Sequence, residues 1–349
     1  MDKITVGIIG PGYWASAFHI PGLKARREVD IVALCGRDRE RIRPVAEMFS
    51  IRTIFTSVTD LIDSGLCQAA VICTPNHLHA PIGIQALERG LSILIEKPMA
   101  VSAEEATSFY RAIKVGTGVA HVNFSRRYWN SMRLLHDEVV KRNLQGAIRE
   151  VRIVDKTSRA AWAYLKRPAP EVIRMLLRTR QDDLPNFRSW DESMGGGVIH
   201  DIGSHLIDQV LWITNAGVRS VRCMPQHSRG APDTKAAIEL ALGQKAHATI
   251  DIDAAWPDEP SVTCEVAAPG FHALAIGAEE LYVNGGRREP DAGVVGGRSA
   301  IDEFIEAMGS RERDLNATVL SGYRVACIVW ACHEARRGMI QVEVEDPAM

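Results

Sequence analysis

Lys97, Asp201 and His205 are the residues of this sequence that best suit proton transfer at a hydroxyl group. Lys97 follows an apolar run at 91–95 that predicts a strand, and Pro98 restricts the residue before it to extended geometry. An ammonium group held there can donate a hydrogen bond to a hydroxyl and stabilise the developing alkoxide. Histidine titrates near neutral pH, so His205 suits removal of the hydroxyl proton.

Asp201 and His205 are separated by one helical turn near the start of a helix predicted over 198–214, so we expect both side chains on one face. Asp201 can bind a neighbouring hydroxyl or tune the imidazole, and Asp208 is the alternative residue to orient that ring. A carboxylate–histidine pair that only caps the helix is the competing interpretation. His200 is expected to point about 100° away and to be structural.

A glycine turn early in the chain predicts a nucleotide site. An apolar run at 4–9 leads into Gly10-Pro11-Gly12-Tyr13-Trp14-Ala15, a helical stretch and a second apolar run at 30–35. This order opens a dinucleotide-binding βαβ unit. Gly10 permits the tight turn, Gly12 lets the backbone approach a pyrophosphate, and Ala15 allows close helix–strand packing. A turn that merely connects strand to helix is the alternative.

The residues after the second strand bear on the choice of dinucleotide. NAD-binding proteins usually place an acidic residue there, against the ribose 2′-hydroxyl. Gly36 takes that position here, and Arg37 follows it. An arginine can bind a 2′-phosphate, so we predict NADP in preference to NAD. Asp38 keeps NAD open, since a register shift would restore an acidic partner, and Arg37 is alternatively an ordinary solvated arginine.

Thr74 and Asn76 follow the apolar run 68–73, which predicts another strand of the same parallel sheet. Ligands bind at the carboxyl ends of such strands, so both residues are candidate ligand contacts, together with Lys97. Asparagine is also a good helix cap, which leaves a structural role open for Asn76. His79 is either a further candidate ligand contact at the carboxyl end of this sheet or a surface residue without a ligand.

The pattern of elements predicts an α/β fold with two domains. Strands and helices alternate up to residue 123, which predicts an N-terminal Rossmann domain over 1–123. Alternating strands over 146–156 and 218–267 predict a C-terminal α+β domain, 124–349, with a large open, mostly antiparallel sheet. A closing helix over 318–337 is able to pack back on the first domain.

Composition narrows the classes of function. The chain has 349 residues and a formal net charge of −2 without a basic run, which argues against a nucleic-acid partner. No apolar run is long enough to span a membrane. The seven cysteines are scattered and show no metal-ligand spacing, so we expect free thiols, a cytoplasmic location and no metal.

Four motifs together resemble a known family. They are Gly-x-Gly-x-x-Ala at 10–15, Thr-Pro-Asn-x-x-His at 74–79, Glu-Lys-Pro at 96–98 and Gly-Gly-Gly-x-x-x-Asp-x-x-x-His at 195–205. In this order they resemble the glucose-fructose oxidoreductase/inositol dehydrogenase/rhizopine catabolism (Gfo/Idh/MocA) family over nearly the whole chain. The resemblance implies an NAD(P)-dependent oxidoreductase of sugars, cyclitols and related polyols. It also implies a homodimer or homotetramer that packs through the C-terminal sheet.

The resemblance also implies roles for individual residues. It supports Lys97, Asp201 and His205 as the catalytic set, in contact with substrate. It adds Arg127, which follows the last Rossmann strand, and Trp162, in an excursion over 159–190 whose aromatic rings can stack on a sugar; structural roles remain the alternatives for both. The implied cofactor contacts are Gly10, Gly12, Tyr13, Trp14, Gly36, Arg37, Thr74, Pro75, Asn76, His79, Glu96 and Lys97.

Two other functions stay open at this point. One is an NAD-dependent glycosidase-like enzyme, which oxidises, eliminates and re-reduces its substrate with a retained cofactor. The other is a non-catalytic protein that senses a nucleotide or sugar. The catalytic set argues against the sensor, because a sensor has no need of those residues.

Overall fold

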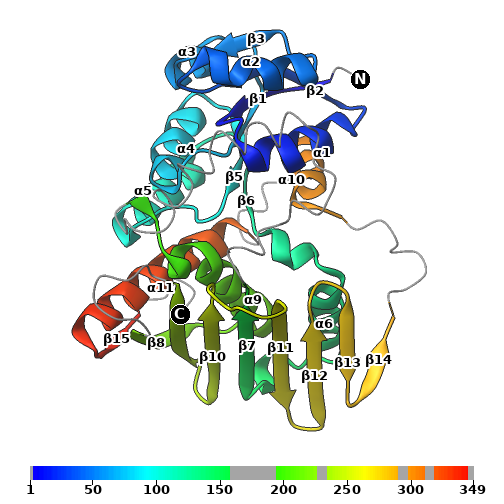
Figure 1. Cartoon of the computed structure of the whole chain (residues 1–349), viewed down its shortest axis with the longest axis vertical. Helices are drawn as coiled ribbons and strands as arrows, with labels where there is room; N and C mark the ends of the chain where they lie inside the picture. Colours follow the sequence, from blue (N-terminus) through cyan, green and yellow to red (C-terminus); the bar gives the residue numbers. More distant parts are fainter. Residues whose placement is uncertain (1–2, 158–193, 226–233, 290–297, 311–317, 345–349) are drawn as a thin grey trace.

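The computed structural model describes residues 3–157, 194–225, 234–289, 298–310 and 318–344. Two sheets dominate it. Figure 1 shows a smaller sheet wrapped by helices at the top of the molecule and a broad sheet at the bottom, with helices between them. The predicted excursion over 159–190, including Trp162, lies outside the described residues.

The first sheet has six parallel strands in the order β3-β2-β1-β4-β5-β6. Its central strands are buried on both faces, which explains why they read as continuous apolar runs. The strand order reverses between β1 and β4, and ligands bind at such switch points. The strands are β1 (Ile4–Ile9), β2 (Val29–Cys35), β3 (Thr53–Phe55), β4 (Ala69–Ile72), β5 (Ser92–Glu96) and β6 (Ala120–Asn123).

Helices cover this sheet and begin where the sequence places caps. Asp38, Ser57 and Ser102 each cap a helix by accepting from amides of its first turn. The helix predicted after the glycine turn is instead a π-helical turn followed by a short α-helix. The segments are η1 (Ala15–His19), α1 (Ile20–Lys24), α2 (Arg39–Met48), α3 (Val58–Asp63), η2 (Asn76–Leu78), α4 (His79–Glu88) and α5 (Ala103–Val115).

The second sheet has the order β14-β13-β12-β11-β7-β10-β9-β8-β15 within the described residues. Its neighbours pair antiparallel except β7 and β10, so the predicted open, mostly antiparallel sheet is confirmed. Its strands are β7 (Glu150–Lys156), β8 (Val218–Pro225), β9 (Lys235–Leu242), β10 (Ala246–Asp253), β11 (Ser261–Ala268), β12 (Phe271–Ile276), β13 (Glu280–Val283), β14 (Gly286–Arg288) and β15 (Gln341–Glu343).

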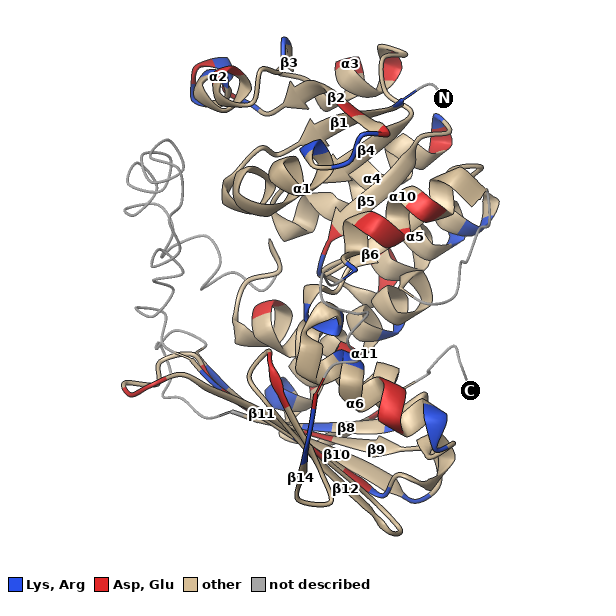
Figure 2. Ribbon diagram, turned by 90° about the vertical axis from the view of Figure 1, so that its right-hand side faces the viewer, with Lys and Arg blue, Asp and Glu red and all other residues tan. Residues whose placement is uncertain are grey.

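Helices α9 and α11 of the second half of the chain lie between the two sheets (Figure 1). In Figure 2 the second sheet is seen nearly edge-on, with α6 and α11 on the face turned toward the first domain. Helix α10 returns to the first domain, where Phe304 joins the core formed by β1 and β2. These segments are η3 (Ser125–Tyr128), α6 (Asn130–Lys141), η4 (Gln145–Ala147), η7 (Ile199–Gly203), α9 (Ser204–Thr214), α10 (Ala300–Ser310) and α11 (Val319–Gly338). Of the described helices, none has the length and apolar character that a bilayer crossing requires.

Candidate active site

The glycine turn brings two backbones into close contact. Gly10 has a φ of 80°. A Cβ at Gly10 would lie 2.8 Å from the carbonyl oxygen of Cys73 and 2.9 Å from the amide nitrogen of Thr74. The Gly10 amide donates to the Cys35 carbonyl at 2.8 Å, so the turn lies between the ends of β2 and β4. Only glycine fits here without displacing β4. The amides beyond Gly12 therefore head a helical segment at the switch point, as phosphate binding requires.

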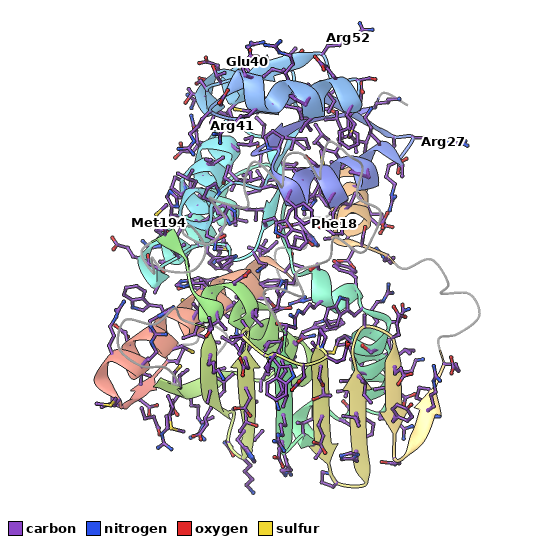
Figure 3. The ribbon with its side chains drawn as sticks, in the orientation of Figure 1. Phe18, Arg27, Glu40, Arg41, Arg52 and Met194 are labelled. Atoms are coloured by element: carbon purple, nitrogen blue, oxygen red, sulfur yellow. The ribbon has the colours of Figure 1, made fainter. Side chains whose placement is uncertain are left out.

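Tyr13 and Trp14 belong to an aromatic cluster with Phe18. The Tyr13 and Trp14 ring centroids are 5.3 Å apart, and the stacked Trp14 and Phe18 rings are 5.1 Å apart. Phe18 is 41 % exposed. Figure 3 shows it on the side of the first domain that is turned toward the second. The cofactor contacts of Tyr13 and Trp14 stay predictions.

Asp38 and Arg37, which follow β2, differ in whether their side chains are already bound within the protein. A Cβ at Gly36 would lie 3.5 Å from Cδ of Pro11, so this strand end adjoins the glycine turn. Oδ1 of Asp38 accepts from two amides of α2 at 3.0 and 3.3 Å, and Oδ2 lies 3.4 Å from Nε of Arg41. Arg37 is exposed, and within the described chain no hydrogen bond or ion pair holds its guanidinium. The Asp38 carboxylate is thus engaged in capping α2, whereas the Arg37 guanidinium is available to a ligand.

The polar side chains of the segment after β4 mainly form hydrogen bonds within the protein. Nδ2 of Asn76 donates to the Gly195 carbonyl at 2.7 Å, which fixes the triple-glycine segment against the first domain. His79 is 1 % exposed, and its ring nitrogens lie 2.8 and 2.9 Å from the carbonyls of Pro98 and Thr74. Burial lowers the pKa of His79. The geometry thus gives Asn76 and His79 structural contacts, and their cofactor contacts remain untested.

Thr74 is the member of this segment that is left with unused hydrogen-bonding capacity. Its Oγ1 is buried and has no hydrogen-bond partner among the described residues. Pro75 is the residue that precedes the 3-10 turn η2. Since buried polar atoms nearly always have partners, the Thr74 hydroxyl is suited to a ligand at this strand end.

Glu96 turns into the first domain. It accepts hydrogen bonds from Nε2 of His19 at 2.7 Å and from Nδ2 of Asn123 at 2.7 Å. Burial disfavours charge on this pair, yet the contact with Glu96 and the neighbouring Cys73 raise the pKa of His19, and His19 in turn lowers the pKa of Glu96. Glu96 therefore links η1 to β6; its predicted cofactor contact is not tested by this geometry.

Lys97 and Asp201 meet across the two domains. Nζ of Lys97 donates to Oδ1 of Asp201 at 2.8 Å and to the Asp201 carbonyl at 2.7 Å. The two side chains are 12 % and 23 % exposed. Lys97 precedes a cis peptide bond to Pro98. An ammonium group has three N–H donors, so one remains for a substrate oxygen.

His205 is buried close enough to Lys97 for the charge of the ammonium to act on its imidazole, and its predicted catalytic role stays a prediction. Burial, and then the positive charges of Lys97 and Arg126, lower the pKa of His205 well below its ordinary value. Its Nδ1 is buried and has no hydrogen-bond partner in the described structure. The imidazole is therefore neutral at physiological pH, which is the state of a proton acceptor.

Asp201 lies in the π-helical turn η7 and His205 in the α-helix α9 that follows it, where the sequence predicted one regular helix. Gly195 and Gly197 have φ values of 75° and 90° and lead the chain into η7. The Asp201 amide donates to the Gly197 carbonyl at 3.1 Å. Such turns often occur at functional sites, because the wider turn redirects side chains. Here the redirected residue is Asp201, which faces Lys97.

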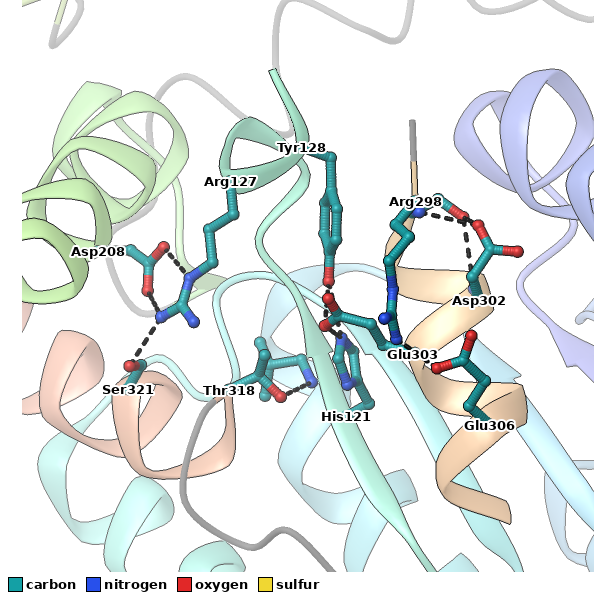
Figure 4. A network of polar contacts seen from close by, with 12 residues as sticks. His121, Arg127, Tyr128, Asp208, Arg298, Asp302, Glu303, Glu306, Thr318 and Ser321 are labelled. Carbon is teal, nitrogen blue, oxygen red and sulfur yellow. Dashed lines mark hydrogen bonds and ion pairs between the residues drawn. The ribbon is translucent and has the colours of Figure 1, made fainter. Parts of the chain in front are cut away.

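Arg127 is held in a closed polar network. Its Nε and Nη2 donate to the two carboxylate oxygens of Asp208, at 2.8 and 2.5 Å, and Nη2 also donates to Oγ of Ser321 at 2.8 Å. Figure 4 shows this cluster next to a second one, in which Tyr128 donates to Glu303 of α10. Asp208 therefore binds Arg127 instead of orienting His205. The substrate contact predicted for Arg127 is untested, and the geometry gives it a bracing role.

His200 makes contacts of a structural kind. It is buried, and its Nδ1 lies 3.0 Å from Nε2 of His333 in α11 and 3.2 Å from the Gly196 carbonyl. The contact between His200 and His333 joins η7 to helix α11.

Sequence reasoning missed Arg126 and Asp155. Nη2 of Arg126 lies 2.7 Å from Oδ2 of Asp155, and Arg126 is one of the cations that act on His205. The signal in the sequence was an arginine beside Arg127 and an acidic residue on the buried face of β7. Neither residue belongs to a motif. No group of histidine, cysteine and acidic side chains in the described chain has the arrangement of a metal site, and none of the seven cysteines forms a disulfide.

Two family models match the chain. The model of the oxidoreductase family with an NAD-binding Rossmann fold matches residues 4–124, and the GFO/IDH/MocA C-terminal domain model matches residues 170–268. The family predicted from the four motifs is therefore confirmed.

Curated relatives are similar at low identity. The chain is 24 % identical to D-glucoside 3-dehydrogenase of Escherichia coli over 65 % of this chain and 58 % of that protein. It is 33 % identical to inositol 2-dehydrogenase of Rubrobacter xylanophilus over 36 % of this chain and 37 % of that protein. The chain matches only part of the length of these relatives. In three of the curated relatives the match covers 31 %, 51 % and 58 % of the relative's own length.

Solved structures share the fold over the whole chain. The WlbA dehydrogenase of Bordetella pertussis, in complex with NADH and UDP-GlcNAcA, has a TM-score of 0.78 at 18 % identity, over 98 % of this chain and 99 % of that one. At that identity the likeness establishes the fold alone. With matching models for its N-terminal and C-terminal parts, the chain belongs to the Gfo/Idh/MocA family of NAD-binding oxidoreductases.

Proposed function

We propose that the protein is an NAD(P)-dependent dehydrogenase, which transfers a hydride between the nicotinamide and the hydroxyl or ketone carbon of a sugar or cyclitol. The observation that carries this proposal is the contact between Lys97 and Asp201, at 2.8 Å, beside a neutral His205. The relatives named for activity on glucosides and inositol support the substrate class.

The residues around the switch point fit a dinucleotide. The position of Gly10 leaves no room for a Cβ, and the amides after Gly12 would hold the pyrophosphate. The unused Thr74 hydroxyl would contact the nucleotide at the neighbouring strand end. When bound, the nicotinamide supplies the hydride acceptor for oxidation and the hydride donor for reduction.

Lys97 and His205 handle the proton in this proposal. During oxidation the remaining N–H of Lys97 donates to the substrate oxygen and stabilises its developing negative charge. The neutral imidazole of His205 accepts the hydroxyl proton as the carbon–hydrogen bond breaks and its electron pair leaves as hydride. Asp201 holds the ammonium in place. In reduction the same groups act in reverse.

We propose NADP as the preferred cofactor. Arg37 is exposed at the end of β2 with no partner in the described chain, so it is available to a 2′-phosphate. Asp38, the residue that would favour NAD, is engaged in capping α2.

We also propose a cytoplasmic homodimer or homotetramer that associates through the second sheet. Among the described helices, α6 and α11 lie on one face of that sheet, which leaves the opposite face for another subunit. Light scattering on the purified protein gives the subunit number, and a monomer at micromolar concentration would contradict this assembly.

The experiment that tests the activity is steady-state turnover of a polyol panel with NAD and with NADP. We expect oxidation of at least one sugar or cyclitol, and a loss of kcat of about 10²- to 10⁴-fold in Lys97→Ala and in His205→Ala. Full activity of both variants on a true substrate would refute the assigned roles. Turnover of a glycoside without net change in nicotinamide absorbance would instead indicate the glycosidase-like reaction.

A further inference from the structure

A cavity of about 260 Å³ lies between the segments η3, α6, η4, α9 and α11. Asn215, which ends α9, belongs to its lining, whereas His205 is in the first turn of the same helix. At 1.5 Å per residue, these two positions are about 15 Å apart along the helix axis. None of Lys97, Asp201 and His205 is among the described lining residues. The cavity is therefore separate from the candidate active site.

The described lining of this cavity is rich in hydrogen-bond donors and contains no acidic residue. Two arginines, Arg127 and Arg324, come from η3 and α11. Gln145 and Asn215 add side-chain amides, and Ser321 adds a hydroxyl. No hydrogen bond within the described chain holds either of the two side-chain amides. A cavity with these walls offers positive charge and hydrogen-bond donors to a ligand.

The protein fixes both guanidinium groups at the cavity wall. Arg324 is 5 % exposed, and its Nη2 donates to the carbonyl of Ala216, just beyond α9. Arg127 donates from Nε and Nη2 to Asp208, and its Nη2 also donates to Oγ of Ser321. Figure 4 shows the Arg127 guanidinium facing these two partners. Both charged groups are therefore in place before a ligand binds, which reduces the entropy cost of binding.

His136 and Trp212 form an uncharged part of the wall. Their rings are stacked, with centroids 4.1 Å apart and an interplanar angle of 4°. Burial lowers the pKa of His136, so its ring is neutral at pH 7. The positive charge of the described lining therefore comes from the two arginines.

We propose that this cavity binds the phosphate group of a small ligand, at a site separate from the nucleotide and the substrate. Arginine is the side chain best suited to phosphate, because its planar fork donates two parallel hydrogen bonds. The donors approach from η3, η4, α11 and the end of α9, which suits tetrahedral oxygens better than the two coplanar oxygens of a carboxylate. The volume lies just under the range of about 300–1,000 Å³ of ligand pockets, so a whole dinucleotide does not fit.

The test is equilibrium dialysis of the full chain against radiolabelled inorganic phosphate, in chloride buffer at an ionic strength of about 0.15 M. The protein is first saturated with NAD or NADP, so that the dinucleotide occupies the glycine turn. We expect one phosphate per chain with a Kd of about 1 mM or below, because two arginines contribute charge-assisted contacts. Acetate should displace the phosphate at least about tenfold less effectively than unlabelled phosphate does, since its oxygens reach fewer donors.

Variants locate the phosphate. Arg324→Met should weaken its binding by about 10- to 150-fold. The double variant Gln145→Ala/Asn215→Gly keeps both arginines and should weaken binding by about fivefold or more. It decides the question if Arg324→Met does not fold, because Asn215 has a φ of 50° that glycine adopts readily. Arg222→Met is the matched control: it removes the same charge from an exposed pair with Glu239 and should leave the phosphate Kd unchanged.

Several results would overturn the inference. Loss of phosphate binding on addition of the dinucleotide would place the phosphate in the nucleotide site. Equal weakening in Arg222→Met would show a diffuse effect of charge, and equal displacement by acetate would show a carboxylate site instead. Absence of phosphate binding in the wild type, or wild-type affinity in the folded cavity variants, would refute the site outright. All of these results leave the proposed hydride transfer standing, because none of them involves turnover.

Discussion

Replacing Gly10 by alanine tests whether the nucleotide turn is as tight as the structure indicates. The methyl group would lie 2.8 Å from a backbone oxygen at the end of β4, and the residue would keep a φ of 80°. The left-handed backbone costs a non-glycine residue about 1–2 kcal/mol. Overpacking against a fixed backbone adds about 1–3 kcal/mol. The free energy of unfolding should therefore fall by about 2–5 kcal/mol.

Gly65→Ala separates the two contributions. Gly65 has a φ of 70°, and a Cβ there would meet nothing within 4 Å. It should show only the backbone cost, so urea unfolding should place Gly10→Ala about 1–3 kcal/mol below Gly65→Ala. Titration of each folded variant with NADP should show binding at least about fivefold weaker for Gly10→Ala alone, because about one kcal/mol or more of strain falls on the phosphate-binding turn. Equal stabilities and wild-type NADP affinity would refute the reasoning.

Arg37→Gln should lower kcat/KM with NADP by about 10- to 150-fold, because it removes a charge-assisted hydrogen bond, and equal losses with NAD would contradict the assignment. Burial and neighbouring cations lower the pKa of His205. The rate of oxidation should therefore fall on the acidic side only below about pH 6.5, and this fall should be absent in His205→Asn. A fall that begins above about pH 6.5 would contradict the assignment. The unfolded chain binds this proton more readily, so the stability linked to His205 is present above about pH 6.5 and declines in urea titrations as pH falls toward the folded pKa. Asp208→Asn should reduce the free energy of unfolding by about 3–5 kcal/mol, since it leaves Arg127 buried without its anion, and a loss under about 1 kcal/mol would show the network to be dispensable.

The first domain was predictable because its signals are local. A glycine turn between an apolar strand and a helix, as at Gly10, determines both the topology and the ligand edge within a few residues. The strand end at Lys97 could be placed for the same reason, since parallel strands bring their carboxyl ends to one edge. In the structure Asp201 contacts Lys97, and the charge of Lys97 acts on the His205 imidazole.

The parts that were missed depend on contacts between distant residues. The strands β12 and β13 alternate over a half-exposed face and carry no long apolar run, so the sequence pattern did not indicate them. The parallel pairing of β7 with β10 joins segments that no short turn connects. The π-helical turn also escaped prediction, and the segment that leads into it is held by a hydrogen bond from Asn76 of the other domain to Gly195.

The sequence pattern also did not indicate that some predicted site residues make structural contacts. His79 fits a motif, yet its ring bridges two backbone carbonyls in the interior. Asp208 could be assigned to His205 by its spacing along the helix, but Arg127 enters from η3 and binds it. Helical spacing defines a face; it does not identify which segment packs on that face.

The most direct test of the central claim is a single-turnover measurement of deuterium transfer from a carbon-deuterated polyol to NADP. The wild type should place deuterium on the nicotinamide ring. With NADP at saturating concentration, Lys97→Met and His205→Asn should each slow that transfer by about 10²-fold or more. Transfer at the wild-type rate in both variants would contradict the claim that an ammonium from the first domain and an imidazole from the second act on the same hydroxyl.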